Sequence, residues 1–252
     1  MTQIHLLILF LAAIWAGAQN QLAGGGSFIT LPALMLTGLD ARAANITSTL
    51  ALFPGQIAGG WIGRRSAGGT ANLTLRALIM ISLVGGAIGA GLLLLTPSNV
   101  FAKMVPWLVL FATCAFAWGS FFRRPAPEAS SASGLQAPLA GALQFVIAIY
   151  GGYFGGGIGF LMMAALALSN VSVRTAAATK NLLAAVMNCT AVVVLALYSP
   201  IHWLEMSVTA VGAVTGSWIG AHMLTRIDER KLRLLVVGIG AALTVGLFLK
   251  AR

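Results

Sequence analysis

Two runs of three glycines are the residues whose type and spacing point most directly to chemistry in this chain. They are Gly24, Gly25 and Gly26 and, 131 positions further on, Gly155, Gly156 and Gly157. Three glycines should break a helix, because each costs about 1 kcal/mol relative to alanine. A helix that resumes after such a break begins with unpaired N–H groups and partial positive charge, and glycine lets an anion approach them. The runs predict an anion site; the alternative is that they only allow close helix packing.

Polar side chains accompany each break and could complete such a site. The candidate anion-binding side chains are Ser27, Thr47, Ser48, Thr179, Lys180 and Asn181. Lys180 stands out because a charge inside a membrane span costs several kcal/mol and marks function by default. The alternative is that Lys180 snorkels toward the membrane surface near Arg174. Gln21 and Tyr153, just before the breaks, are hydrogen-bond donors for an anion or packing residues.

The composition indicates a polytopic helical membrane protein, because apolar stretches long enough to span a bilayer recur along the chain. Hydrophobic residues make up 59% of the chain and charged residues only 8%, whereas soluble domains carry about 25% charged residues. Lys and Arg cluster at the ends of apolar segments, so the net charge of +10 reflects membrane orientation and lipid contact rather than nucleic-acid binding. Cys114 and Cys189 lie in apolar segments and are expected to be small core residues.

The chain divides into two transmembrane repeats, residues 1–124 and 137–252, joined by a linker over 125–136 that is rich in Pro, Ala and Ser. In each half an apolar segment leads into the glycines, and a short apolar segment and three ordinary spans follow. The expected segments are 4–22, 27–37, 43–62, 74–95 and 101–121, then 137–154, 158–169, 175–198, 203–224 and 231–250. Glycines spaced four residues apart in the later spans fit helix packing, namely Gly85 with Gly89 and Gly216 with Gly220.

The distribution of basic residues places corresponding loops of the two halves on opposite sides of the membrane. The loop at 63–72 is basic, whereas its counterpart at 199–202 lacks Lys and Arg; the loop at 96–99 is poor in charge, whereas its counterpart at 226–231 is basic. Inverted repeats need an odd number of crossings per half. A glycine-broken helical hairpin plus three spans satisfies this, whether the hairpin is re-entrant or crosses on both limbs. The alternative is one kinked helix, which gives four spans per half and parallel repeats.

No grouping typical of an enzyme accompanies these features. The sequence offers no Ser/His/Asp grouping, no paired carboxylates, no HExxH and no Walker-type loop. We therefore expect no cofactor, no metal and no direct ATP coupling within this chain. The competing function is an integral-membrane enzyme or an accessory subunit without transport activity of its own.

At these residues the chain resembles the sulfite exporter TauE/SafE family of bacterial membrane proteins. The resemblance covers nearly the whole chain and rests on the glycine break followed by Pro32, the Ala-rich helix starts at 42–48 and 174–181, and the run Gly216-Ser217-Trp218-Ile219-Gly220-Ala221. The second half has Met163 where the first has Pro32, so the short helices are not strictly symmetric. The resemblance implies transport of sulfite, sulfonates or other small organic or sulfur-containing anions across the inner membrane.

These observations together predict an all-α, multi-pass protein of the bacterial inner membrane that acts as a secondary transporter, an exporter or facilitator, of a small anion. The anion is expected near mid-membrane between the two glycine-broken helices, and alternation is expected to come from the hairpins moving against the other spans. The expected partners are the anionic substrate and membrane lipid. The sequence leaves open the substrate, the direction, the coupling ion and the formation of a homo-oligomer.

Overall fold

The computed structural model describes residues 3–22, 24–118, 135–223 and 229–250, which form ten helices and no strands. The helices are α1 (Gln3–Leu22), α2 (Ser27–Leu36), α3 (Ala41–Gly63), α4 (Leu75–Leu95), α5 (Ser98–Ala117), α6 (Ala137–Tyr153), α7 (Ile158–Leu168), α8 (Val173–Tyr198), α9 (Trp203–Met223) and α10 (Glu229–Lys250). Four of these described helices, α1, α4, α5 and α8, contain stretches long and apolar enough to cross a membrane. The predicted all-α membrane fold is confirmed.

Local sequence signals set the ends of several helices. The Asp40 side chain accepts hydrogen bonds from the first turn of α3, and the Thr74 hydroxyl does the same for α4. Gly38 and Asn170 follow the short helices α2 and α7 with φ of 101° and 57°. These left-handed residues end the short helices in the way that glycine and asparagine commonly do, so the chain can turn sharply into α3 and α8.

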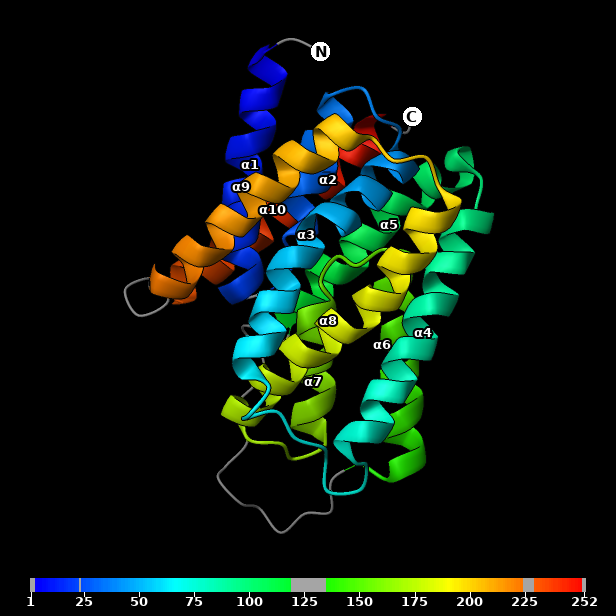
Figure 1. Cartoon of the computed structure of the whole chain (residues 1–252), viewed down its shortest axis with the longest axis vertical. Coiled ribbons are helices and arrows are strands. Elements are labelled where there is room, and N and C mark those ends of the chain that lie inside the picture. Colours follow the sequence, from blue (N-terminus) through cyan, green and yellow to red (C-terminus); the bar gives the residue numbers. More distant parts are fainter. Residues whose placement is uncertain (1–2, 23, 119–134, 224–228, 251–252) are drawn as a thin grey trace.

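The chain reverses direction at each glycine break, so that α1 with α2 and α6 with α7 form two helical hairpins. α1 packs against α2, and α6 packs against α7. In Figure 1 the first hairpin enters from the end of the molecule where α1 begins, and the second enters from the opposite end. The kinked-helix alternative therefore does not describe the structure.

The remaining helices run in opposite directions in the two halves. In Figure 1, α3 leads away from the end where α1 begins, whereas its counterpart α8 leads toward that end. α4 and α9 also run in opposite senses, and α10 ends near the level at which α1 begins. These are the directions that an inverted repeat requires, so they support that prediction.

The two halves interlock through equivalent glycine contacts. α1 packs against α9, and α6 packs against α4. Gly216 on α9 faces the backbone of Ile14, and Gly85 on α4 faces the backbone of Phe145. The offset of 131 relates Gly85 to Gly216 and Ile14 to Phe145, so each contact is the counterpart of the other. The prediction that these spaced glycines serve helix packing is confirmed.

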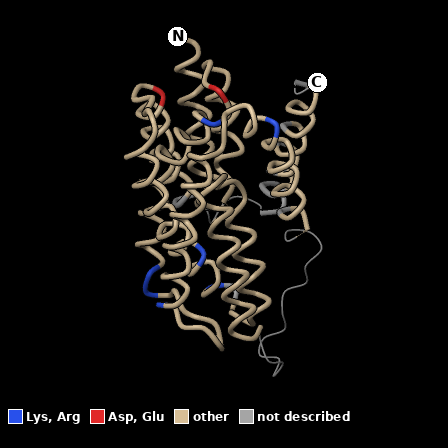
Figure 2. Tube along the Cα trace, turned by 90° about the vertical axis from the view of Figure 1, so that its right-hand side faces the viewer, with Lys and Arg blue, Asp and Glu red and all other residues tan. Residues whose placement is uncertain are grey.

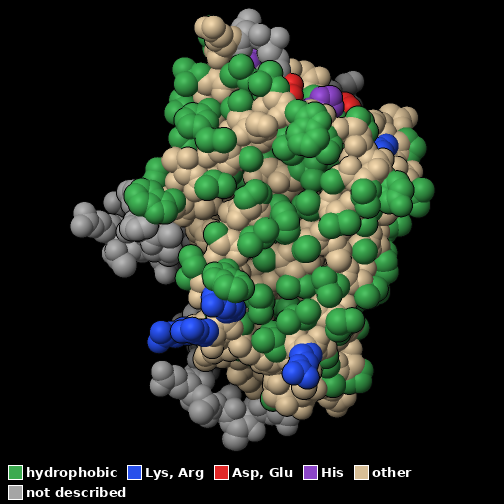
Figure 3. All heavy atoms as spheres, viewed as in Figure 1, with side chains coloured by type: hydrophobic (Ala, Val, Ile, Leu, Met, Phe, Trp, Pro, Cys, Tyr) green, Lys and Arg blue, Asp and Glu red, His purple; other side chains and the backbone are tan. Residues whose placement is uncertain are grey.

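The surface has the character of a membrane protein, with apolar side chains over its middle and charged ones near its ends (Figure 3). Exposed large hydrophobic residues include Trp15, Trp61, Trp107 and Trp218. In Figure 2 the acidic residues lie at the end where α1 begins, and Lys and Arg lie mostly toward the other end. The positive-inside rule predicts a cytoplasmic location for such a basic end.

Both described cysteines differ from expectation. Cys114 and Cys189 are exposed on the surface of the chain, so the prediction that they are core residues was wrong. Lipid-facing positions in a membrane are as apolar as the core, and an apolar segment therefore does not reveal which of its residues face inward. The predicted linker over 125–136 lies largely outside the described residues, and so does the first half of the basic loop over 226–231.

Candidate functional site

The glycine breaks have backbone conformations that favour glycine. Gly24 and Gly25 have φ of 81° and 82°, and Gly155 and Gly157 have φ of 77° and 76°. Residues with a Cβ seldom adopt these left-handed angles. Because α2 begins at Ser27 and α7 begins directly after Gly157, each break leads straight into the N-terminus of a short helix.

Backbone N–H groups at both breaks have no acceptor in the part of the chain that the structure describes. They belong to Gly25, Gly26 and Ser27 in the first half and to Gly156, Gly157 and Ile158 in the second. Such groups at a helix N-terminus, together with the helix dipole, favour a negative charge nearby. Both breaks therefore have the donors that the sequence predicted for an anion site.

The two breaks meet where the tips of the hairpins come together. A Cβ placed on Gly24 would lie 3.4 Å from the Cα of Gly159, and a Cβ placed on Gly155 would lie 4.0 Å from the Oγ of Ser27. Each tip thus touches the first turn of the other half's short helix. The N-termini of α2 and α7 are side by side, although they are far apart in the sequence.

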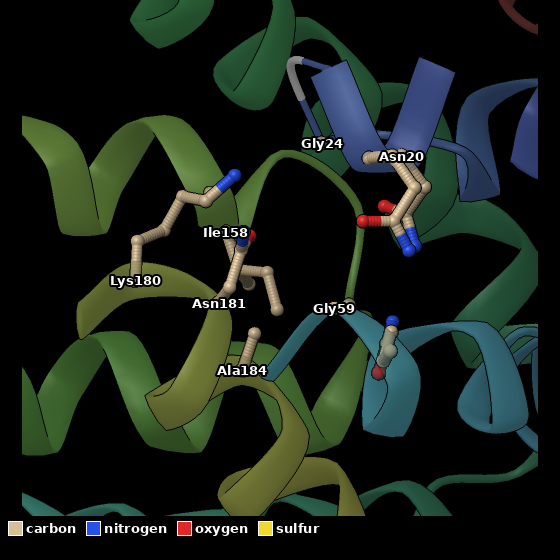
Figure 4. A pocket seen from close by; sticks show the side chains of 11 residues that line it. Asn20, Gly24, Gly59, Ile158, Lys180, Asn181 and Ala184 are labelled. Carbon is tan, nitrogen blue, oxygen red and sulfur yellow. The ribbon is translucent and has the colours of Figure 1, made fainter. Parts of the chain in front are cut away.

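A polar cavity lies beside this meeting point. The centre of a water-sized sphere can occupy about 30 Å³ of it, and one water needs roughly 10–15 Å³ by that measure, so the cavity suits two or so waters or one small anion. Figure 4 shows Lys180, Asn181 and Ala184 on one side of the cavity and Asn20 and Gly24 on the other. The remaining lining residues are Gln21, Gln56, Gly59, Gly155, Ile158 and Gly159.

Lys180 brings a positive charge to the cavity. Its side chain is 6% exposed, and no described acid or hydrogen-bond acceptor pairs with it. The residue lies about two turns into α8, on the cavity wall, which is not the position of a side chain that snorkels to the membrane surface. A buried charge without a partner is expensive.

Carboxamides make up most of the other polar lining. Gln21 donates through Nε2 to the carbonyl of Gly55 at 2.8 Å, and Oε1 of Gln56 accepts from Nδ2 of Asn188 at 2.8 Å. The sequence analysis missed Gln56, which lies inside an otherwise apolar stretch of α3. One signal was available: Gln56 and Asn188 are equivalent positions at an offset of 132, so both halves carry an amide at the same depth.

Phe28 fills the other side of the contact between the breaks. It is 1% exposed, and its ring atoms lie 3.0 to 3.4 Å from the positions that a Cβ would occupy on Gly25, Gly156 and Gly157. These three glycines therefore make room for an aromatic ring and do not line the cavity. The space that we expected an anion to occupy beside Gly25 and Gly156 holds Phe28.

The predicted hydroxyl residues make contacts within the protein. Thr179 donates to the carbonyl of Gly68 at 3.0 Å and accepts from the N–H of the same residue at 2.9 Å, which holds the α3–α4 loop on α8. The Ser48 and Thr30 hydroxyls lie 2.6 Å apart. Thr47 is buried and does not line the cavity. Of the predicted site residues, those that line the cavity are Gly24, Gly155, Lys180 and Asn181.

The polar groups that line the cavity are one amine, several carboxamides and backbone amides, and none of them forms a nucleophile–base pair. Among the described residues, no group of three or more His, Cys, Asp and Glu could hold a metal ion.

Comparison with known proteins identifies the family to which the chain belongs. Residues 9–247 match the family described as sulfite exporter TauE/SafE. The chain belongs to this family. Similar proteins include the probable membrane transporter protein YfcA of Escherichia coli strain K12, which is 26% identical over 95% of this chain and 88% of its own length. A probable membrane transporter protein of Haemophilus influenzae is 28% identical over 92% of this chain and 90% of its own length.

A third relative, the probable membrane transporter protein ORF9 of a Sinorhizobium species, is 27% identical over 96% of this chain and 92% of its own length. Membership of the TauE/SafE family supports a transporter role and is consistent with a protein that is not an enzyme. Together with the apolar helices, it indicates a multi-pass membrane protein.

Proposed function

We propose that this TauE/SafE protein is a secondary transporter, an exporter or facilitator, of a small anion such as sulfite, a sulfonate or another small organic anion. One observation carries the proposal: Lys180 is a buried cation with no acidic partner among the described residues, on the wall of a cavity that Gly24 and Gly155 also line. A buried charge needs a counter-charge. An anion in the cavity would supply it.

Dipoles around the cavity favour the same ligand. The N–H groups of Gly25, Gly26 and Ser27, and of Gly156, Gly157 and Ile158, donate to no described protein acceptor. Ile158 lines the cavity, and the others lie close in the chain to Gly24 or Gly155, which also line it; helix N-termini attract anions. Donors of this kind carry no net charge. The anion would therefore be attracted by the full charge of Lys180 and by the dipoles at two helix N-termini.

The position of the cavity suits alternating access. It lies where the hairpin of one half touches the hairpin of the other, and α3 and α8 form its remaining walls. Broken helices at the interface of two repeats are the usual place for a transporter substrate site. Movement of the hairpins against α3 and α8 would expose the anion to one side of the membrane and then to the other. We place the protein in the bacterial inner membrane, with its basic end toward the cytoplasm.

The test is anion flux in liposomes that contain only the purified protein. We expect uptake of radiolabelled sulfite, or of another small anion from a panel of sulfonates and carboxylates. Lys180→Met should lower this uptake at least tenfold, which corresponds to about 1.4 kcal/mol. Lys103→Met, which removes an exposed lysine on α5, is the matched control and should leave uptake unchanged. Absence of flux for every anion, or equal flux in the two variants, would overturn the proposal.

A further inference from the structure

We infer that Gln56 is an anion-binding residue of the cavity and that Asn188 positions it, an inference that rests on the proposed function. Gln56 lines the cavity on α3. Its Oε1 accepts a 2.8 Å hydrogen bond from Nδ2 of Asn188 on α8. Its Nε2 donates to no described protein atom, so this group remains available to a ligand.

The contact with Asn188 decides which end of the Gln56 amide faces the cavity. A carboxamide carries an acceptor oxygen at one end and an NH₂ donor at the other. Because Asn188 holds the oxygen, the NH₂ group is left for the cavity, where it can donate to an anion. Without that contact the amide could turn over and present its oxygen, which repels an anion.

An unsatisfied atom accompanies this arrangement. Asn188 is 2% exposed, and its Oδ1 is buried with no hydrogen-bond partner in the described chain. Buried polar atoms are seldom left in this state. If both amides turned over, Oδ1 of Asn188 would accept from Nε2 of Gln56, but Nδ2 of Asn188 would take the buried position without a partner and Gln56 would turn its oxygen to the cavity. Either orientation leaves one polar atom of Asn188 unsatisfied, and the orientation in the structure is the one that offers a donor to the anion.

The pair also joins the two halves of the protein. Gln56 and Asn188 are equivalent positions at an offset of 132, the same offset that relates Arg42 to Arg174. They meet where α3 packs against α8. A residue that contacts its own counterpart lies where the repeats meet, so Gln56 is placed to bind the anion beside both hairpins.

The first experiment measures the KM and the maximal rate of radiolabelled sulfite uptake in liposomes. Gln56→Glu keeps an oxygen for Asn188 and the shape of the side chain, but it replaces the donor with a charged acceptor. We expect uptake to fall at least about tenfold. Gln56→Met, which loses only the hydrogen-bonding group, should raise KM by about tenfold and covers the case in which Gln56→Glu does not fold. Unchanged KM and rate in a folded Gln56 variant would overturn the inference.

The second experiment tests whether Asn188 acts through Gln56. Asn188→Ala alone should raise KM. In the Gln56→Met background it should raise KM no further, because the two residues act as one unit. Lower thermal stability with unchanged KM would show that Asn188 is merely structural and would overturn its positioning role. If the wild-type protein transports no anion, the proposed function itself is overturned. Sulfite uptake that depends on Lys180 but not on Gln56 overturns this inference alone.

Discussion

The Cα of Gly159 lies 3.4 Å from the point that a Cβ of Gly24 would occupy. The tip of the first hairpin therefore rests on the first turn of α7, without a side chain between them. This contact brings the two helix N-termini together beside Lys180. A Cβ on Gly24 would be in ordinary van der Waals contact there, and the position favours glycine because of its left-handed φ of 81°.

Substitution of Gly24 tests whether this contact matters for transport. We expect Gly24→Ala to lower anion flux by about tenfold, because the new methyl group would lie against the Cα of Gly159 at the wall of the cavity. The left-handed φ of 81° adds strain of roughly 1–2 kcal/mol. Flux and thermal stability are measured on the same purified protein.

Gly38→Ala is the matched control for that strain. Gly38 has φ of 101° and nothing within 4 Å of an added Cβ, so alanine brings similar backbone strain far from the cavity. We expect Gly38→Ala to lose stability but keep its flux. Equal loss of flux in both variants would mean that strain, and not the contact at the hairpin tips, causes the effect.

Gly156 has a different predicted phenotype from Gly24. Its Cβ position lies 3.0 Å from the ring of Phe28 and 2.6 Å from that of Phe154, so a larger side chain displaces buried aromatic rings. We expect Gly156→Leu to reduce folding, measured as the yield of monodisperse protein, because overpacking costs about 1–3 kcal/mol or more. If the Gly156→Leu protein is well folded and loses only its flux, Gly156 would instead be assigned to the anion site.

Thr179 is expected to hold a loop rather than an anion. Thr179→Val removes the hydroxyl that pairs with both backbone groups of Gly68. Hydrogen exchange at Gly68 should accelerate, whereas the KM for the anion should stay the same. Thr179→Ser, which keeps the hydroxyl, should exchange like the wild type. A raised KM in Thr179→Val with unchanged exchange at Gly68 would contradict this assignment.

Much of the fold could be predicted from the sequence, because apolar length, glycine runs and loop charges are local signals. The ten helices match the ten expected segments to within a few residues. Less of the candidate site could be predicted from the sequence. In the sequence, nothing distinguishes Phe28 from the other apolar residues near Gly25. Only the packing of one hairpin on the other shows that its ring occupies the space between the breaks. Gln56 was missed because a single amide in a span carries no pattern of its own.

Membrane topology is a direct test of the inverted arrangement. Reporters fused after Arg65 and after Arg124 should read cytoplasmic, because these positions follow pairs of arginines. A reporter after Arg252 should read periplasmic, because α10 ends near the level at which α1 begins (Figure 1). A cytoplasmic C-terminus would rule out inverted repeats with three full spans each.

The interlocking of the halves leads to the last prediction. An alanine methyl at Gly216 would overlap the backbone of Ile14, so α9 would have to move away from α1. We expect Gly216→Ala to lower stability by about 1–3 kcal/mol, the usual cost of overpacking. Gly85→Ala, at the equivalent position on α4, would meet Ala148 and the backbone of α6 and should lose a similar amount.

Gly91→Ala is the matched control, because an added Cβ meets nothing within 4 Å. Alanine is the better helix former by about 1 kcal/mol, so this variant should be as stable as the wild type or more stable. Thermal unfolding in detergent compares the three variants. If Gly216→Ala and Gly85→Ala unfold at the same temperature as Gly91→Ala, the close approach of α1 to α9 and of α6 to α4 is not what holds the halves together. If only one of them is destabilised, the two contacts are not energetically equivalent, despite their equivalent positions in the repeats.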